Sequence, residues 1–188
     1  MIRKAFLFAL YVHGEQVRKD GTPYIEHPVE VALELARNGA DNSLIAAGYL
    51  HDTIEDAYIT KEELEAAFNR EVAELVFADS EDKSKSWEER KKDALDSLKC
   101  PGDRKHKMLM CADKLSNLRS IYDGLQKEGD SVWNRFSRGK EKQAWLYNET
   151  VSALAPLEGL QMYEELKRLV TEIFNEDGNA NAKDKINS

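Results

Sequence analysis

Four ionisable side chains follow one another at the end of an apolar stretch. His51 and Asp52 come directly after the apolar residues 46–50. Glu55 and Asp56 each follow four residues later, a spacing that places side chains on the same face of a helix. Removing so many charges from water costs several kcal/mol per ion unless a counter-ion is present. A bound cation is the economical explanation, and the alternative is that Glu55 and Asp56 lie past the helix end in solvent.

Two further side chains extend this set. Asp113 interrupts a stripe of apolar residues with helical spacing, and Asn117 lies on the same face four residues later. His27 lies just before Pro28, in a segment with turn chemistry. Taken singly, Asp113 is better explained by pairing with a neighbouring cation, and His27 by packing. Together with His51 and Asp52, however, they form a mixed nitrogen and oxygen donor set, which suits Mn²⁺, Fe²⁺ or Zn²⁺ better than Ca²⁺ or an all-thiolate zinc site.

The elements that must position these side chains are helices. Apolar residues recur with helical spacing along nearly the whole chain, and no stretch alternates with period two for long enough to form a strand. We therefore predict an all-α fold, a single bundle of about eight to ten helices. The expected helices cover residues 2–17, 28–38, 42–54, 60–69, 71–77, 87–98, 103–122, 139–154 and 157–174, with a loop at 79–86 and a break at 124–130.

The chain has 188 residues, which is the usual length of one domain. We predict one domain over residues 1–174 and a disordered tail over 175–188, because the tail is rich in Asn, Gly, Ala, Lys and Asp. No apolar run approaches the ~20 residues of a membrane span. Cys100 and Cys111 form no metal-binding or disulfide pattern, so a reducing, cytoplasmic setting is expected.

The charge balance excludes some partners. The chain has 35 acidic and 27 basic residues and a formal net charge of −8. Proteins that bind nucleic acids or membrane surfaces in general recruit these polyanions through an excess of Lys and Arg. The basic run 104–107, which includes His106, is short and is expected to be solvated. We therefore expect neither nucleic acid nor membrane as a partner, while the oligomeric state, a homo-oligomer included, stays open.

Three sequence motifs resemble those of a known family. They cover residues 16–28, 50–56 and 112–119, and they contain His27, His51-Asp52 and Asp113. This arrangement is similar to the HD-domain metal-dependent phosphohydrolases, an all-helical superfamily, and within it to the hydrolase domain of RelA/SpoT-type enzymes. The short chain is similar to the small stand-alone alarmone hydrolases, a group that includes the metazoan SpoT homologue. The resemblance covers residues 2–122 and is weak beyond residue 124.

The resemblance implies roles for individual residues. One Mn²⁺ per chain would be held by His27, His51, Asp52 and Asp113. Glu55 and Asp56 would position and activate the attacking water, since a carboxylate beside a metal site can accept a proton from it. The implied substrate contacts are Arg18 against the guanine, Asn117 at the nucleoside, and Lys19, Lys114 and Arg119 at phosphates. Arg138 is added on charge grounds, together with Arg135 and Lys140.

The implied reaction is removal of the 3′-pyrophosphate of guanosine 3′,5′-bis(diphosphate), giving GDP or GTP and pyrophosphate. The substrate and partner would then be a guanosine polyphosphate. Two alternatives remain: an HD-domain phosphatase acting on another nucleotide, such as a deoxynucleoside monophosphate or NADPH, and a non-catalytic alarmone-binding module. The retained Glu55-Asp56 pair favours the enzyme over the binding module.

Overall fold

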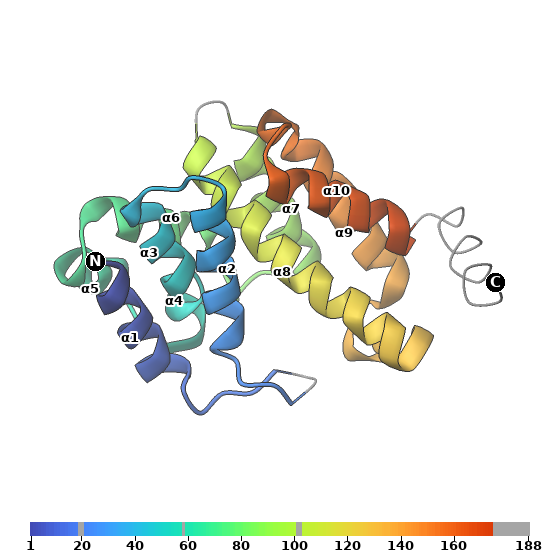
Figure 1. Cartoon of the computed structure of the whole chain (residues 1–188), viewed down its shortest axis with the longest axis horizontal. Helices are drawn as coiled ribbons and strands as arrows, with labels where there is room; N and C mark the ends of the chain where they lie inside the picture. The colour runs from blue at the N-terminus through green and yellow to red at the C-terminus, as the bar shows by residue number, and fades with distance from the viewer. Residues whose placement is uncertain (19–20, 58, 101–102, 175–188) are drawn as a thin grey trace. The chain divides into compact units, whose positions relative to one another are not determined.

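The first half of the chain is built around one short, apolar helix. Helix α3 (Asn42–Leu50) packs against α1 (Ile2–His13), α2 (Glu26–Arg37) and α6 (Arg70–Asp79) (Figure 1). Most of its residues are buried, as expected for a helix that is apolar nearly all round. The Asp41 side chain caps it by accepting a hydrogen bond from the Leu44 backbone N–H at 3.0 Å. This helix ends directly at His51.

The computed structural model describes residues 1–18, 21–57, 59–100 and 103–174. The chain divides into two compact units, Met1–Asp113 and the residues from Lys114 onwards. The first unit also contains α4 (Thr53–Ala57), α5 (Lys61–Ala67), α7 (Trp87–Lys99) and the beginning of α8 (Arg104–Glu128). The second contains the rest of α8, the 3-10 helices η1 (Gly129–Arg135) and η2 (Ala155–Leu157), α9 (Gly139–Ala153) and α10 (Gln161–Phe174).

Glycine at position 48 allows α2 and α3 to approach closely. A Cβ atom there would lie 2.8 Å from Leu35 Cδ1 and 3.1 Å from the Ala32 Cα atom. The second of these neighbours is backbone, which cannot move without shifting α2 as a whole. The contact therefore sets the spacing between α2, which carries His27, and α3, which leads to His51.

Helix α8 enters the core of the first unit. Every residue from 106 to 113 is buried, including the polar residues His106, Lys107 and Asp113, so this part of the helix is enclosed on all sides. At its start, the Lys105 ammonium group bonds to the carboxylates of Asp41 and Glu71, which lie at the beginnings of α3 and α6. Asp113 is thus carried on a helix that is held by the same elements as His27 and His51.

In the second unit, α9 packs against α10 and both 3-10 helices. Leu166, Leu169, Val170 and Ile173 form the buried stripe of α10, and Tyr147 of α9 stacks on Phe174 with ring centroids 5.8 Å apart. The prediction of a single domain over residues 1–174 stays a prediction. The predicted tail lies outside the described residues.

The all-α fold is confirmed: ten α-helices and no strand are found in the described ranges. The predicted helix that starts at Thr60 is found as α5, and Thr60 and Glu63 bond to each other's backbone N–H groups in a capping box. The second helix begins at Glu26, earlier than predicted, because Pro28 is tolerated within the first turn. Among the residues described, no helix has both the length and the apolar character needed to cross a membrane.

Three predicted helices are too long. The helix expected over 157–174 begins only at Gln161. The helix expected over 2–17 ends at His13, because Gln16 and Arg18 pair through their backbones with residues 22–24 around an isolated bridge between Val17 and Pro23. The helix expected over 42–54 is interrupted at residues 51–52. There the Thr53 hydroxyl donates to the Leu50 carbonyl at 2.7 Å, a side-chain bond that competes with the helical backbone pattern.

The break predicted at 124–130 is misplaced, because α8 continues to Glu128 and η1 follows directly. Gly124 does not end the helix. A glycine is needed here because Val132 packs so closely that a Cβ at position 124 would lie 2.6 Å from the Val132 Cγ2 atom. Tertiary packing thus explains a glycine that the sequence alone suggests as a helix stop.

We expect Gly48→Ala to destabilise the protein. Alanine improves intrinsic helix propensity by ~1 kcal/mol, but overpacking in a filled core costs ~1–3 kcal/mol, and here the added methyl group would meet both the Leu35 side chain and the α2 backbone at Ala32. The net loss in the free energy of unfolding should be ~1–2 kcal/mol, measured by urea denaturation. Asn42→Ala, at an exposed position of the same helix, should stay within ~0.5 kcal/mol. Equal or higher stability of Gly48→Ala would show that α2 can retreat.

Candidate metal centre

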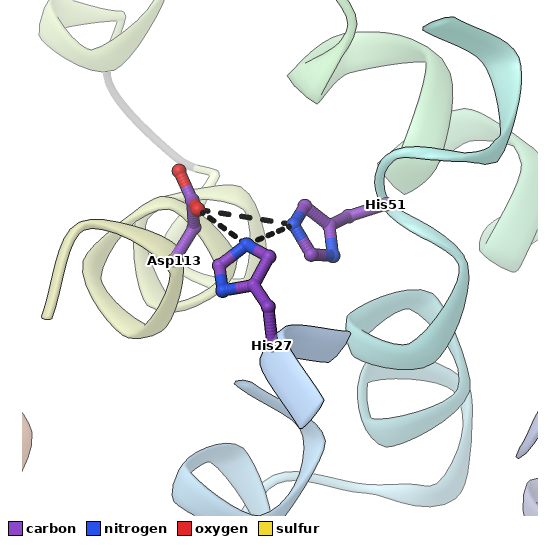
Figure 2. Close-up of side chains that lie close together, drawn as sticks. All are labelled: His27, His51 and Asp113. Atoms are coloured by element: carbon purple, nitrogen blue, oxygen red, sulfur yellow. Dashed lines mark hydrogen bonds and ion pairs between the residues drawn. The ribbon is translucent and has the colours of Figure 1, made fainter. Parts of the chain in front are cut away.

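Three buried side chains from separate helices converge in the first unit. Figure 2 shows His27 at the beginning of α2, His51 at the end of α3 and Asp113 on α8 pointing toward one another. The two imidazole Nε2 atoms are 3.1 Å apart, and Asp113 Oδ1 lies 3.2 Å from the Nε2 of His27 and 3.8 Å from that of His51. One ligand atom from each residue lies within 4.8 Å of the others. Three of the four predicted ligands are thus brought together.

Asp52, the fourth predicted ligand, adjoins this cluster. Its Oδ2 atom lies 3.0 Å from His51 Nε2 and 3.7 Å from His27 Nε2. The same oxygen accepts a hydrogen bond from the Tyr24 hydroxyl at 2.6 Å. Asp52 therefore faces both imidazoles. It is held by a hydrogen bond from Tyr24, a contact that the sequence did not indicate.

The local structure explains why the imidazoles face inward. His27 lies on the buried face of α2, one turn before Val31 and two turns before Leu35. His51 follows the last residue of α3, and its Nδ1 atom lies 2.9 Å from the Gly48 carbonyl oxygen. A histidine whose Nδ1–H donates to a carbonyl presents Nε2 for coordination, which is the usual arrangement of a metal-bound imidazole.

The charges of the cluster depend on one another. Burial opposes a charge on His51, but the carboxylates of Asp52 and Asp113 outweigh it and raise the pKa of His51 to about 10. His51 in turn outweighs the effect of burial on Asp52 and lowers the pKa of that carboxyl group. Burial, and next the Asp52 charge, raise the pKa of Tyr24, so its hydroxyl stays protonated and donates. In the metal-free chain a proton on His51 thus offsets the carboxylates, and a cation would displace it.

The donor set fits a divalent metal ion. Ligand atoms ~2.1 Å from one ion lie ~3.0–3.5 Å apart when they occupy neighbouring positions around it. The separations within the cluster run from 3.0 to 3.8 Å, so little movement is needed for the atoms to share an ion. Two imidazole nitrogens with carboxylate oxygens are typical ligands of first-row transition metals.

Glu55 and Asp56 lie on α4, the short helix that follows directly after the His51-Asp52 turn. Glu55 Oε1 accepts a hydrogen bond from the Glu81 backbone N–H at 2.8 Å. The Lys83 ammonium group donates to the Glu55 backbone carbonyl at 2.6 Å and to Asp56 Oδ1 at 3.3 Å. Burial raises the pKa of Glu55, and the charges of Asp52 and Glu81 add to this effect. Both carboxylates are therefore fixed by the segment that follows α6.

The predicted substrate residues are spread over both units. Arg18 lies in the first unit in the paired segment between α1 and α2, and Lys19 lies outside the described residues. Lys114, Asn117 and Arg119 follow Asp113 on α8 in the second unit, and exposed Arg138 directly precedes α9. Their contact with a substrate stays a prediction.

Arg119 already has a partner. Its guanidinium group donates to both carboxylate oxygens of Glu165, with Nε–Oε1 and Nη2–Oε2 distances of 2.8 and 2.7 Å. Such a bidentate pair is among the stronger ion pairs in proteins. A phosphate contact by Arg119 would require this pair to break.

Sequence reasoning missed Tyr24, Glu81 and Lys83. Tyr24 lies in the same sequence motif as His27, which could have drawn attention to it. Nothing in the residue spacing, however, indicates its hydrogen bond to Asp52. The expectation that His106 is solvated is wrong: it is 3% exposed, and its Nε2 atom faces Asp79 Oδ1 at 3.9 Å. Burial lowers the pKa of His106, so it is neutral rather than part of a basic surface.

Comparison with known proteins agrees with this geometry. The HD-domain family model matches residues 5–141. A protein of Aquifex aeolicus named guanosine-3′,5′-bis(diphosphate) 3′-pyrophosphohydrolase is 35% identical over 161 residues, which are 83% of this chain and 21% of that protein. The chain thus spans about a fifth to a quarter of the length of the curated relatives it matches.

Two solved structures share the fold. The structure of lmo0812 from Listeria monocytogenes EGD-e is 38% identical, with a TM-score of 0.75 over 80% of this chain and 99% of that chain. A structure titled as a metazoan ortholog of SpoT that hydrolyses ppGpp is 24% identical, with a TM-score of 0.74 over 89% of this chain and 92% of that chain. Since the matched residues 5–141 are well over half of the sequence and include the whole His and Asp cluster, this chain belongs to the HD-domain family.

Proposed function

We propose that the chain is a Mn²⁺-dependent hydrolase that removes the 3′-pyrophosphate of guanosine 3′,5′-bis(diphosphate), giving GDP or GTP and pyrophosphate. The observation that carries the proposal is the buried cluster of His27, His51 and Asp113 with Asp52 beside it, followed at once by the Glu55-Asp56 helix. The name of the Aquifex relative supports the choice of substrate.

In this proposal His27, His51, Asp52 and Asp113 hold one Mn²⁺. A divalent ion supplies Lewis-acid stabilisation of phosphoryl oxygens and lowers the pKa of water. Glu55 accepts the proton of the attacking water, and a carboxylate whose pKa is raised by burial suits a general base. Asp56 orients that water. The Glu81 N–H and Lys83 keep both carboxylates in place.

The substrate is highly anionic, while the chain carries a net charge of −8. The proposed dication reverses the sign of the potential where acidic residues are concentrated, and Arg18 adds a planar cation that can stack on guanine. Lys19, Lys114, Asn117 and Arg138 complete the proposed contacts, and Arg119 joins them only if it leaves Glu165. Cys100 and Cys111 are free thiols, which supports a reducing, cytoplasmic setting.

The central prediction is metal-dependent release of pyrophosphate. The purified protein should release pyrophosphate from guanosine 3′,5′-bis(diphosphate) with Mn²⁺ and lose this activity with a chelator. Asp113→Ala removes one ligand and should abolish the reaction. Product is measured by chromatography of the nucleotide and enzymatic detection of pyrophosphate.

The same assay separates the alternatives. A panel with a deoxynucleoside monophosphate and NADPH tests whether another nucleotide is preferred. Turnover no higher than that of Asp113→Ala, at any metal, would contradict hydrolysis of the tetraphosphate. Tight binding of the tetraphosphate without turnover would instead indicate a binding module.

Glu55→Gln should separate chemistry from metal binding. The amide keeps the shape of the side chain but accepts no proton, so turnover should fall at least ~100-fold, the usual contribution of a general base. Bound manganese, quantified by elemental analysis, should be unchanged. If manganese is lost together with activity, Glu55 is a ligand and the assignment of roles is wrong.

Lys83→Met should lower turnover through the position of Glu55 and Asp56. Because misplacement of a reacting group costs up to ~100-fold, we expect a roughly 10-fold fall in kcat. The matched control is Lys85→Met, two residues further along the same segment, where the ammonium group pairs with Asp93 at 2.8 Å. Equal effects of the two substitutions would attribute the loss to the segment as a whole.

A further inference from the structure

Asp52 is the least buried of the four proposed ligands. Its side chain is 22% exposed, against 1% for His51, 4% for His27 and 10% for Asp113. It also lies in the interrupted turn between α3 and α4 rather than within a long helix. An aspartate in such a position can rotate toward solvent, so its orientation at the cluster needs a fixed partner.

Tyr24 supplies that partner. Its hydroxyl donates to Asp52 Oδ2 at 2.6 Å, the length of a charge-assisted bond to a carboxylate. The bond joins residues that are 28 positions apart in the sequence. The same Oδ2 atom lies 3.0 Å from His51 Nε2, so the bond holds the oxygen that faces the imidazoles.

Packing fixes the direction of the Tyr24 hydroxyl. The ring lies against His13, with centroids 5.0 Å apart, and forms a T-shaped pair with His27, with centroids 6.0 Å apart. His13 is itself held by Gln16, whose Oε1 atom lies 3.0 Å from the His13 Nδ1 atom. These two aromatic neighbours restrict the orientation of the ring and therefore the position of its hydroxyl group.

The backbone of Tyr24 closes the segment that carries Arg18. The Tyr24 N–H donates to the Gln16 carbonyl at 2.9 Å, and the Arg18 N–H donates to the Thr22 carbonyl at 2.8 Å. Arg18 is thus held in a paired loop whose base is Tyr24. Tyr24 therefore joins the two parts of the site: its backbone bonds to the loop, and its side chain bonds to the proposed metal ligand Asp52.

We propose that Tyr24 is a positioning residue, which holds Asp52 facing the metal and fastens the Arg18 loop to the metal centre. The inference rests on the ligand set of the proposed function but not on the identity of the substrate. Partners that orient a ligating group typically contribute 10- to 100-fold in metal affinity, and the effect is expected here without any nucleotide present.

The experiment compares Mn²⁺ affinity of the full chain with that of Tyr24→Phe, which removes one hydroxyl and keeps the ring. Free Mn²⁺ is measured by electron paramagnetic resonance during titration of the metal-free proteins. We expect Tyr24→Phe to bind Mn²⁺ ~10- to 100-fold more weakly. The matched control is Tyr122→Phe, which removes a hydroxyl bonded to Glu172 at 3.0 Å in the second unit, and should leave the affinity unchanged.

A second measurement tests the link to the loop. Trypsin cleaves after Arg18, and Mn²⁺ should slow this cleavage, followed by mass spectrometry, in the unsubstituted protein but not in Tyr24→Phe. Circular dichroism and thermal unfolding of the metal-free variant establish that it is folded.

Equal Mn²⁺ affinities of Tyr24→Phe and the unsubstituted protein would overturn the positioning role, and equal protection at Arg18 would overturn the link to the loop. Neither result contradicts the proposed reaction, which is tested separately by pyrophosphate release from the unsubstituted protein. Absence of Mn²⁺ binding by the unsubstituted protein would refute the ligand set and this inference together.

Discussion

The electrostatic balance at His27, His51, Asp52 and Asp113 is the constraint on which the structure depends. Carboxylates and imidazoles stand 3.0–3.8 Å apart in a largely buried place, where unpaired charges are costly. Without a cation, the balance requires a proton on His51. The close contact of α2 with α3, the buried passage of α8 and the interrupted turn at residues 51–52 all serve to bring these groups together despite that cost.

Much of the fold could be predicted, because helical spacing of apolar residues is a local property. The existence of most helices followed from it. The helix ends did not. At residues 16–18 the backbone pairs with residues 22–24, at 51–53 side chains bond to the helical carbonyls, and at position 124 the packing of Val132, rather than a helix end, accounts for the glycine. Each outcome depends on a partner that is distant in the sequence or on side-chain geometry.

The candidate site was likewise predictable from the sequence only in part. Residue type and spacing, together with the family resemblance, were enough to single out the proposed ligands, three of which the structure brings together, and the Glu55-Asp56 pair. The partners that orient them were not visible, because Tyr24 and Lys83 act over 28 and 27 positions of sequence. The pairing of Arg119 with Glu165 and the burial of His106 also depend on the tertiary structure. A single sequence does not show which of several competing partners a side chain contacts.

The absence of a side chain at Gly48 also bears on how the ion is exchanged. Because the α2 backbone rests directly on α3, the relation between His27 and His51 is set by the core and not by the ion. The site is preorganised, so binding does not have to repay the conformational entropy of assembling it. The proposed ion would therefore leave and return while the chain stays folded, unlike in small zinc domains whose folding is metal-driven. Catalytic capacity would then follow the supply of metal on the timescale of ion exchange rather than of refolding.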